Sequence, residues 1–143
     1  MSHHIKNKIG TYILPISLAV SIFVASSNQH LAVLNVNIPF SADKLLHLLI
    51  FGLLATLILR TKKQKQLRIR DMIVSISIVS TYGILDEMRQ SFTPGRSVEL
   101  GDWIADTIGA FTAVILYGRY ESYRNILEYR VEFKAQKKSA QIV

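Results

Sequence analysis

Four apolar blocks of similar length divide this sequence, and they restrict its fold more than any other feature. They cover residues 9–27, 43–59, 72–90 and 102–117. Each block has about 16 to 20 residues, close to the length that a helix needs to cross about 30 Å of hydrocarbon. Helices are the conformation that fits, because an open strand would leave its backbone groups unpaired in lipid. The pattern predicts an all-α membrane bundle of four transmembrane helices.

The composition agrees with a membrane location. Half of the 143 residues are apolar and only 19% are charged, which leaves little charged surface for a soluble domain of this size. The net charge of +7 would suggest nucleic acid as the partner of a soluble protein. Here the position of the basic residues along the chain explains the charge better, so we expect the lipid bilayer and no nucleic acid. The absence of cysteine excludes disulfides, thiolate metal ligands and a thiol nucleophile.

The basic residues predict the orientation of the helices. Of the 17 lysines and arginines, all except Lys44, Arg89 and Arg96 precede the first block, separate the second from the third, or follow the fourth. The positive-inside rule therefore places both termini in the cytoplasm.

The expected domain organisation follows from this topology. Residues 1–8 form a cytoplasmic N-terminus, residues 9–118 a four-helix transmembrane domain, and residues 119–143 a basic cytoplasmic tail that is either amphipathic or flexible. A signal peptide is the alternative for the first block, since lysines precede it and small residues end it. The apolar stretch is long for a signal peptide, which favours a retained helix.

Six of the ten acidic residues lie on the other side of the predicted bundle, and the other four lie among the basic residues. Asp43 and His47 are four positions apart, and Asp102 and Asp106 repeat this spacing, so each pair shares one helix face. The predicted topology brings both pairs and Glu87 to a similar depth near the outer interface. Because ionisable groups that face lipid are costly, we expect these five residues to face one another or a polar recess.

Three interpretations of this polar cluster remain open. The carboxylates could pair with the nearby basic residues and serve only to hold the bundle together. The recess could bind an anion, with helix N-termini and positive side chains as ligands; the residues concerned are Arg96, Arg89, Gln90 and Lys44. The cluster could hold a divalent cation such as Mg, Mn or Zn for phosphoester chemistry; the possible metal ligands are Asp43, His47, Glu87, Asp102 and Asp106. Catalysis is an open question on the sequence alone.

Small residues within the blocks predict how the helices pack. Gly52, Gly83 and Gly109 are expected where two helices approach closely. Hydrogen bonds between helices are expected for Ser75, Ser77, Ser80 and Thr81.

Four short motifs occur in a fixed order over residues 40–118. They are D-K-x-x-H (Asp43, Lys44, His47), Y-G-x-x-x-E-x-x-Q (Tyr82, Gly83, Glu87, Gln90), P-G-R (Pro94, Gly95, Arg96) and D-x-x-x-D-x-x-G (Asp102, Asp106, Gly109). As an ordered set they resemble the VanZ-like family of small bacterial membrane proteins. The resemblance implies a multi-pass protein of the bacterial cytoplasmic membrane. It also implies a connection with the cell envelope, because the family's namesake is associated with low-level resistance to the glycopeptide teicoplanin.

The resemblance names no reaction. Together with the polar cluster, it leads us to expect an outward-facing recess that binds an anionic cell-envelope component, either a lipid-linked phosphate or a cell-wall precursor.

Overall fold

The computed structural model describes residues 2–27, 40–62, 68–92 and 98–127, and its long elements are all helices. They are α1 (Ser2–Ser26), α3 (Phe40–Arg60), α4 (Ile69–Gln90) and α5 (Leu100–Arg119). A short helical segment at residues 121–127 follows α5. Each apolar block of the sequence lies in one of the four long helices, which confirms the all-α fold class.

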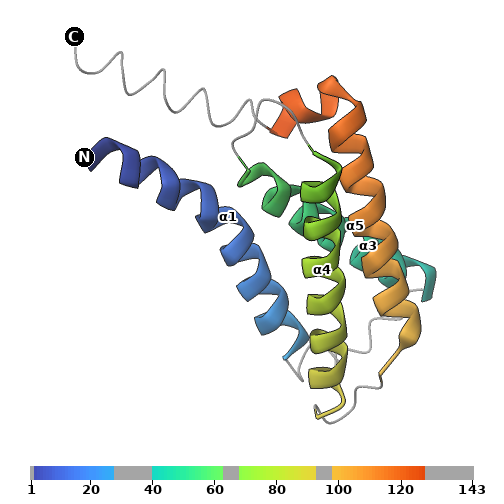
Figure 1. Cartoon of the computed structure of the whole chain (residues 1–143). Helices are drawn as coiled ribbons and strands as arrows, with labels where there is room; N and C mark the ends of the chain where they lie inside the picture. The colour runs from blue at the N-terminus through green and yellow to red at the C-terminus, as the bar shows by residue number, and fades with distance from the viewer. Residues whose placement is uncertain (1, 28–39, 63–67, 93–97, 128–143) are drawn as a thin grey trace.

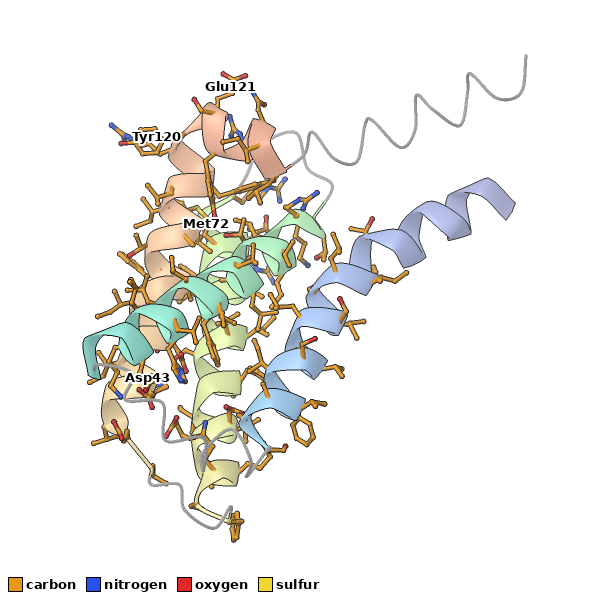
Figure 2. All side chains as sticks on the ribbon, turned by 180° about the vertical axis from the view of Figure 1, so that it is seen from behind. Asp43, Met72, Tyr120 and Glu121 are labelled. Atoms are coloured by element: carbon orange, nitrogen blue, oxygen red, sulfur yellow. The ribbon has the colours of Figure 1, made fainter. Side chains whose placement is uncertain are left out.

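The helices form an antiparallel bundle with two distinct ends (Figure 1). Helices α4 and α5 run alongside each other, α3 crosses them obliquely, and α1 leans against α3 and α4. Helices α3 and α5 therefore begin at the end of the bundle where α1 and α4 finish. Figure 2 shows Asp43 near this end, while Met72, Tyr120 and Glu121 lie at the opposite end.

Buried apolar side chains from all four helices form one core. Helix α1 contributes Ile22, and the other helices contribute Phe51, Leu54, Ala55, Leu59, Val79, Ala110, Val114 and Tyr117. Close van der Waals contact is what holds helices together in lipid, because the surrounding acyl chains are as apolar as the core.

Glycines allow the closest of these helix contacts. A Cβ atom on Gly109 would collide with the carbonyl oxygen of Leu48, and one on Gly52 would lie 2.8 Å from the carbonyl oxygen of Gly109. A Cβ on Gly83 would lie 2.8 Å from the Asp106 carboxylate. The expectation that these three glycines occupy close helix contacts is confirmed, and the α3–α5 crossing depends on two of them.

Hydrogen bonds between helices supplement this packing. The Ser75 hydroxyl donates to the carbonyl oxygen of Ala55 at 2.6 Å, which links α4 to α3. The hydroxyls of Ser80 and Thr107 are 2.9 Å apart, and the Trp103 indole N–H donates to Ser80 at 3.2 Å. Ser75 and Ser80 thus make the interhelical bonds that the sequence predicts. For Ser77 and Thr81, which are exposed on α4, the prediction is wrong, because neither hydroxyl bonds another helix among the described residues.

The membrane character of the helices differs from one to another. Among the described residues, α5 alone combines 20 residues with few charges and a mean hydropathy of 1.2, and the apolar stretch of α1 is shorter, at Thr11–Ser26. Helix α3 carries as many charged residues as α5, and α4 carries more, of which Asp86 and Glu87 are buried; large apolar side chains of α3 and α4 are exposed, among them Leu45, Leu49, Leu85 and Met88. Composition alone therefore marks one clear membrane-length helix and one shorter apolar helix.

Candidate carboxylate and histidine site

The first turns of α3 and α5 place a group of ionisable side chains opposite one another. Asp43 and His47 lie one turn apart on α3, and Asp102 and Asp106 lie one turn apart on α5. The glycine crossing brings these two helices close, so the two faces meet. We call this group the acidic cluster, and it comprises Asp43, Lys44, His47, Glu87, Glu99, Asp102 and Asp106.

Lys44 is the basic residue at the centre of the acidic cluster. Its ammonium group lies 2.6 Å from the Glu99 carboxylate, contacts Asp102 Oδ1 and is 3.8 Å from Asp43 Oδ2. Gly101 leaves room for it, since a Cβ there would lie 3.1 Å from Lys44 Cε. The charge of Lys44 is therefore shared among three carboxylates.

The two ring nitrogens of His47 face different carboxylates. Nδ1 lies 2.9 Å from Asp106 Oδ1, and Nε2 lies 4.0 Å from Asp102 Oδ2. Because an ionised carboxylate only accepts hydrogen bonds, Nδ1 carries the proton in the bond to Asp106. In the neutral imidazole Nε2 then presents its lone pair toward Asp102. The ring is also stacked on Phe51, with centroids 5.8 Å apart.

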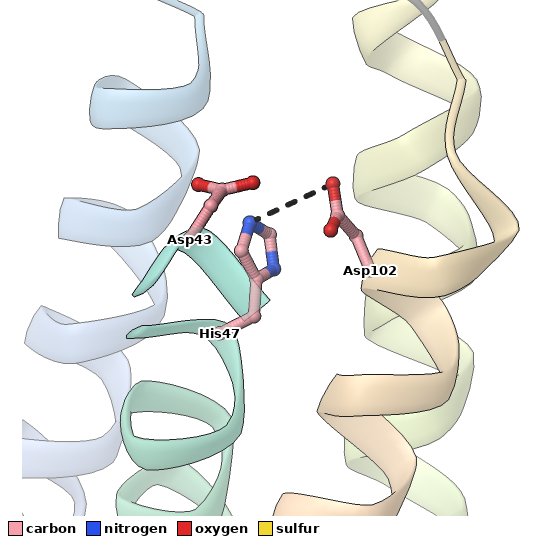
Figure 3. Close-up of side chains that lie close together, drawn as sticks. All are labelled: Asp43, His47 and Asp102. Carbon is pink, nitrogen blue, oxygen red and sulfur yellow. Dashed lines mark ion pairs between the residues drawn. The ribbon is translucent and has the colours of Figure 1, made fainter. Parts of the chain in front are cut away.

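Three members of the acidic cluster could together hold a metal ion. One ligand atom from each of Asp43, His47 and Asp102 lies within 4.8 Å of the other two (Figure 3). Two carboxylates and one imidazole suit Mn or Zn better than a cation that demands only oxygen ligands. A metal-binding histidine commonly donates its other ring N–H to a carboxylate, which fixes its orientation, and Asp106 occupies this position behind His47.

Glu87, the remaining residue of the predicted metal set, has a different position. Its carboxylate accepts a hydrogen bond from the backbone N–H of Glu99 at 2.9 Å, which ties the last turn of α4 to the start of α5. The charges of His47, Asp102 and Asp106 act on this carboxylate, so Glu87 belongs to the same electrostatic environment.

Arg89 and Gln90, which the sequence suggested as anion ligands, lie around Asp86. Asp86 Oδ1 accepts hydrogen bonds from Ser26 at 2.7 Å and from Arg89 at 2.8 Å, and Oδ2 accepts one from Gln90 at 3.0 Å. The Arg89 guanidinium also contacts the hydroxyls of Ser26 and Ser27 and lies 4.3 Å from the centre of the Phe23 ring. This Asp86 cluster (Ser26, Ser27, Asp86, Arg89 and Gln90) fastens α1 to α4. Arg96, the other predicted anion ligand, lies outside the described residues.

Sequence reasoning left four of these residues out of the site. Glu99 precedes Asp102 by three positions, and Asp86 precedes Arg89 by three, so helical spacing could have indicated both. Ser26 and Ser27 give no comparable signal, because their partners Asp86 and Arg89 lie 60 and 62 positions away on another helix.

The fold and the acidic cluster define a class of protein: a bundle of apolar helices in which carboxylates, a lysine and a histidine lie together at one end. The chain belongs to the VanZ/LLP1 family, whose model matches residues 2–121. This match confirms the resemblance seen in the motifs and extends it over α1. No curated protein and no solved structure matches the chain.

Proposed function

We propose that this protein crosses the bacterial cytoplasmic membrane four times, with both termini in the cytoplasm and the acidic cluster at the extracytoplasmic end. In this proposal the acidic cluster holds a divalent cation, and the cation binds an anionic envelope component such as a lipid-linked phosphate or a cell-wall precursor.

The outer faces of the helices support the four crossings. Large apolar side chains are exposed on all four long helices, for example Leu14, Leu49, Leu85 and Phe111. Exposed apolar surface of this extent suits contact with lipid. The charged residues of α3 and α4 lower the mean hydropathy of these helices, but those in the acidic cluster face neighbouring helices and would not have to enter lipid.

The observation that carries the proposed binding activity is the convergence of Asp43, His47 and Asp102, with Asp106 behind the histidine. The acidic cluster contains five carboxylates and one lysine, so a bare anion would meet repulsion there. A divalent cation would offset this charge and keep coordination positions open for phosphate oxygens.

This arrangement also changes the binding roles that the sequence predicts for the basic residues. Lys44 already contacts carboxylates of the acidic cluster, and Arg89 is paired with Asp86. We therefore assign the main contact with the anion to the cation and retain Arg96, which precedes α5 in the sequence, as a second contact.

A manganese titration tests the cation site. Protein purified in detergent and stripped with a chelator should bind one Mn²⁺ per chain, measured from the electron paramagnetic resonance signal of free Mn²⁺. Asp102→Asn should weaken binding at least about tenfold, because it removes one charged ligand. Glu121→Gln is the matched control, since Glu121 is exposed at the opposite end. Failure of the wild type to bind Mn²⁺ would refute the site.

Native mass spectrometry tests the anionic ligand. Phosphatidylglycerol, used as a phosphate-bearing probe, should stay bound to the wild type in Mn²⁺ and be lost in chelator, and Arg96→Ala should reduce its retention. Equal retention with and without metal would contradict a bridging cation. Hydrolysis of either phosphoester bond of the probe in Mn²⁺, detected as phosphatidic acid or diacylglycerol, would instead identify the chain as a metal-dependent phosphoester enzyme.

A structural role is the second candidate, and the position of Lys44 favours it. The Lys44 ammonium group, which lies among three carboxylates, already offsets part of the negative charge of the acidic cluster without a ligand. If this is the whole function, substitutions in the acidic cluster should lower thermal stability, and Mn²⁺ should have no effect on any of them.

A further inference from the structure

A cavity lies between α1, α3 and α4, in the half of the bundle away from the acidic cluster. It has a volume of about 370 Å³ and mostly apolar walls. Tyr82 is part of its lining, and the Tyr82 hydroxyl donates to the carbonyl oxygen of Ala19 at 2.7 Å. The apolar wall includes Pro15, Ile16, Leu54, Ile58, Ile78 and Val79.

The rim of this cavity carries two opposite charges. Lys62 follows the end of α3, and Asp71 lies in the first turn of α4. Asp71 Oδ2 is buried and has no hydrogen-bond partner among the residues that the structure describes. Because a buried acceptor without a donor is costly, this oxygen is suited to receive an N–H or O–H from a ligand.

The dimensions of the cavity fit an acyl chain. Along α4 its wall runs from Asp71 to Tyr82, and a helix rises about 1.5 Å per residue, so the wall is about 16 Å long. A chain lying there would have its polar end beside Lys62 and Asp71. That position is at the level of the basic end of the bundle, where lipid headgroups are expected.

We propose that the cavity binds one acyl chain of a phospholipid whose headgroup carries both a phosphate and a primary ammonium, the chemistry of phosphatidylethanolamine. The ammonium donates to Asp71 Oδ2, and the phosphate accepts from the Lys62 ammonium. A purely anionic headgroup would place its charge beside Asp71 without supplying a cation. A choline headgroup has the cation but lacks an N–H donor. This site is independent of the acidic cluster and of any metal.

The test is a competition between lipids with identical acyl chains, followed by native mass spectrometry of the full chain. Phosphatidylethanolamine should be retained about tenfold over phosphatidylcholine, the discrimination expected of one hydrogen bond to a charged group. Asp71→Asn should bring the two lipids within about threefold, because the amide removes the charge that strengthens this bond. Glu121→Gln should keep the wild-type preference, and Ile78→Trp should reduce retention of both lipids by filling the cavity.

A second series needs no variant. Mono- and dimethylated phosphatidylethanolamine each keep at least one N–H donor and phosphatidylcholine keeps none, so retention by the wild type should persist through the dimethylated lipid and fall at phosphatidylcholine, the end of the series. Equal retention across the series, or a preference that survives Asp71→Asn, would overturn the proposal. In chelator, which removes retention through the proposed cation site, stronger retention of phosphatidylglycerol than of phosphatidylethanolamine would overturn it as well, because it would show recognition of the phosphate alone.

Discussion

The unequal surroundings of the two His47 nitrogens make Asp106 a positioning residue for the proposed cation site. Asp106→Ala removes the acceptor at Nδ1, so the ring loses its fixed orientation and Mn²⁺ affinity should fall about 10- to 100-fold. Asp106→Asn should lose less Mn²⁺ affinity, because the asparagine amide oxygen can still accept a hydrogen bond from Nδ1. Titration of both variants followed by electron paramagnetic resonance measures the difference. Equal losses for the two variants would show that Asp106 does not act by orienting the ring.

Lys44 provides a second test at the scale of one residue. Lys44→Gln leaves Glu99 and the buried Asp102 without the ammonium group, so the free energy of unfolding should fall by about 1–3 kcal/mol in chelator. A cation that binds the folded protein raises its stability, so Mn²⁺ should restore the melting temperature of this variant. Thermal denaturation in detergent, with and without Mn²⁺, measures both effects. A melting temperature that Mn²⁺ leaves unchanged would favour the purely structural role.

Helical spacing predicts part of this cluster and misses the rest for a physical reason. The interval of four between Asp43 and His47, and between Asp102 and Asp106, was enough to predict that each pair shares a helix face. The spacing of residues within one helix does not determine which residue of another helix a given side chain contacts. That choice depends on helix rotation and crossing, and so the contact of Asp86 and Arg89 with Ser26 of α1 was not predicted.

At the scale of whole helices, hydropathy located the interior of each element better than its ends. Helix α1 begins at Ser2, although the apolar block begins only at residue 9. Lysine favours helix nearly as well as leucine does, so Lys6 and Lys8 end the apolar block without ending the helix. After α5, Tyr120 adopts an extended conformation before the chain becomes helical again at residues 121–127. The remainder of the predicted tail lies outside the described residues.

The crossing of α3 and α5 is the element on which the acidic cluster depends. Gly109→Ala should cost about 1–3 kcal/mol in unfolding free energy and weaken Mn²⁺ binding, because its Cβ would collide with the Leu48 backbone and push the helices apart. Gly118→Ala on the same helix is the matched control, since its Cβ would meet only the flexible end of Met72 at 3.3 Å. Thermal denaturation should separate the two variants, and equal melting temperatures would contradict this account of the crossing.

At the scale of the whole molecule, the two proposed sites lie in opposite halves of one bundle. The acidic cluster is formed where α3 and α5 begin, and the cavity opens where α3 ends and α4 begins. In the predicted topology the first site faces outward and the second faces the cytoplasmic leaflet. The two lipid proposals therefore share one premise, the orientation of the bundle, while their chemistry is independent.

This orientation can be measured directly, because the natural chain has no cysteine and any introduced thiol is unique. Ser91 follows α4 at the acidic end, and Ser122 follows α5 at the basic end; both are exposed. A membrane-impermeant maleimide should label Ser91→Cys in intact cells and Ser122→Cys only after the membrane is opened, because the positive-inside rule retains the basic end in the cytoplasm. Labelling of both thiols in intact cells would place them on the same side of the membrane, with an even number of spans between them, and would contradict a membrane-crossing α5. The reverse pattern would place the acidic cluster inside the cell, where an envelope component on the outer leaflet could not reach it.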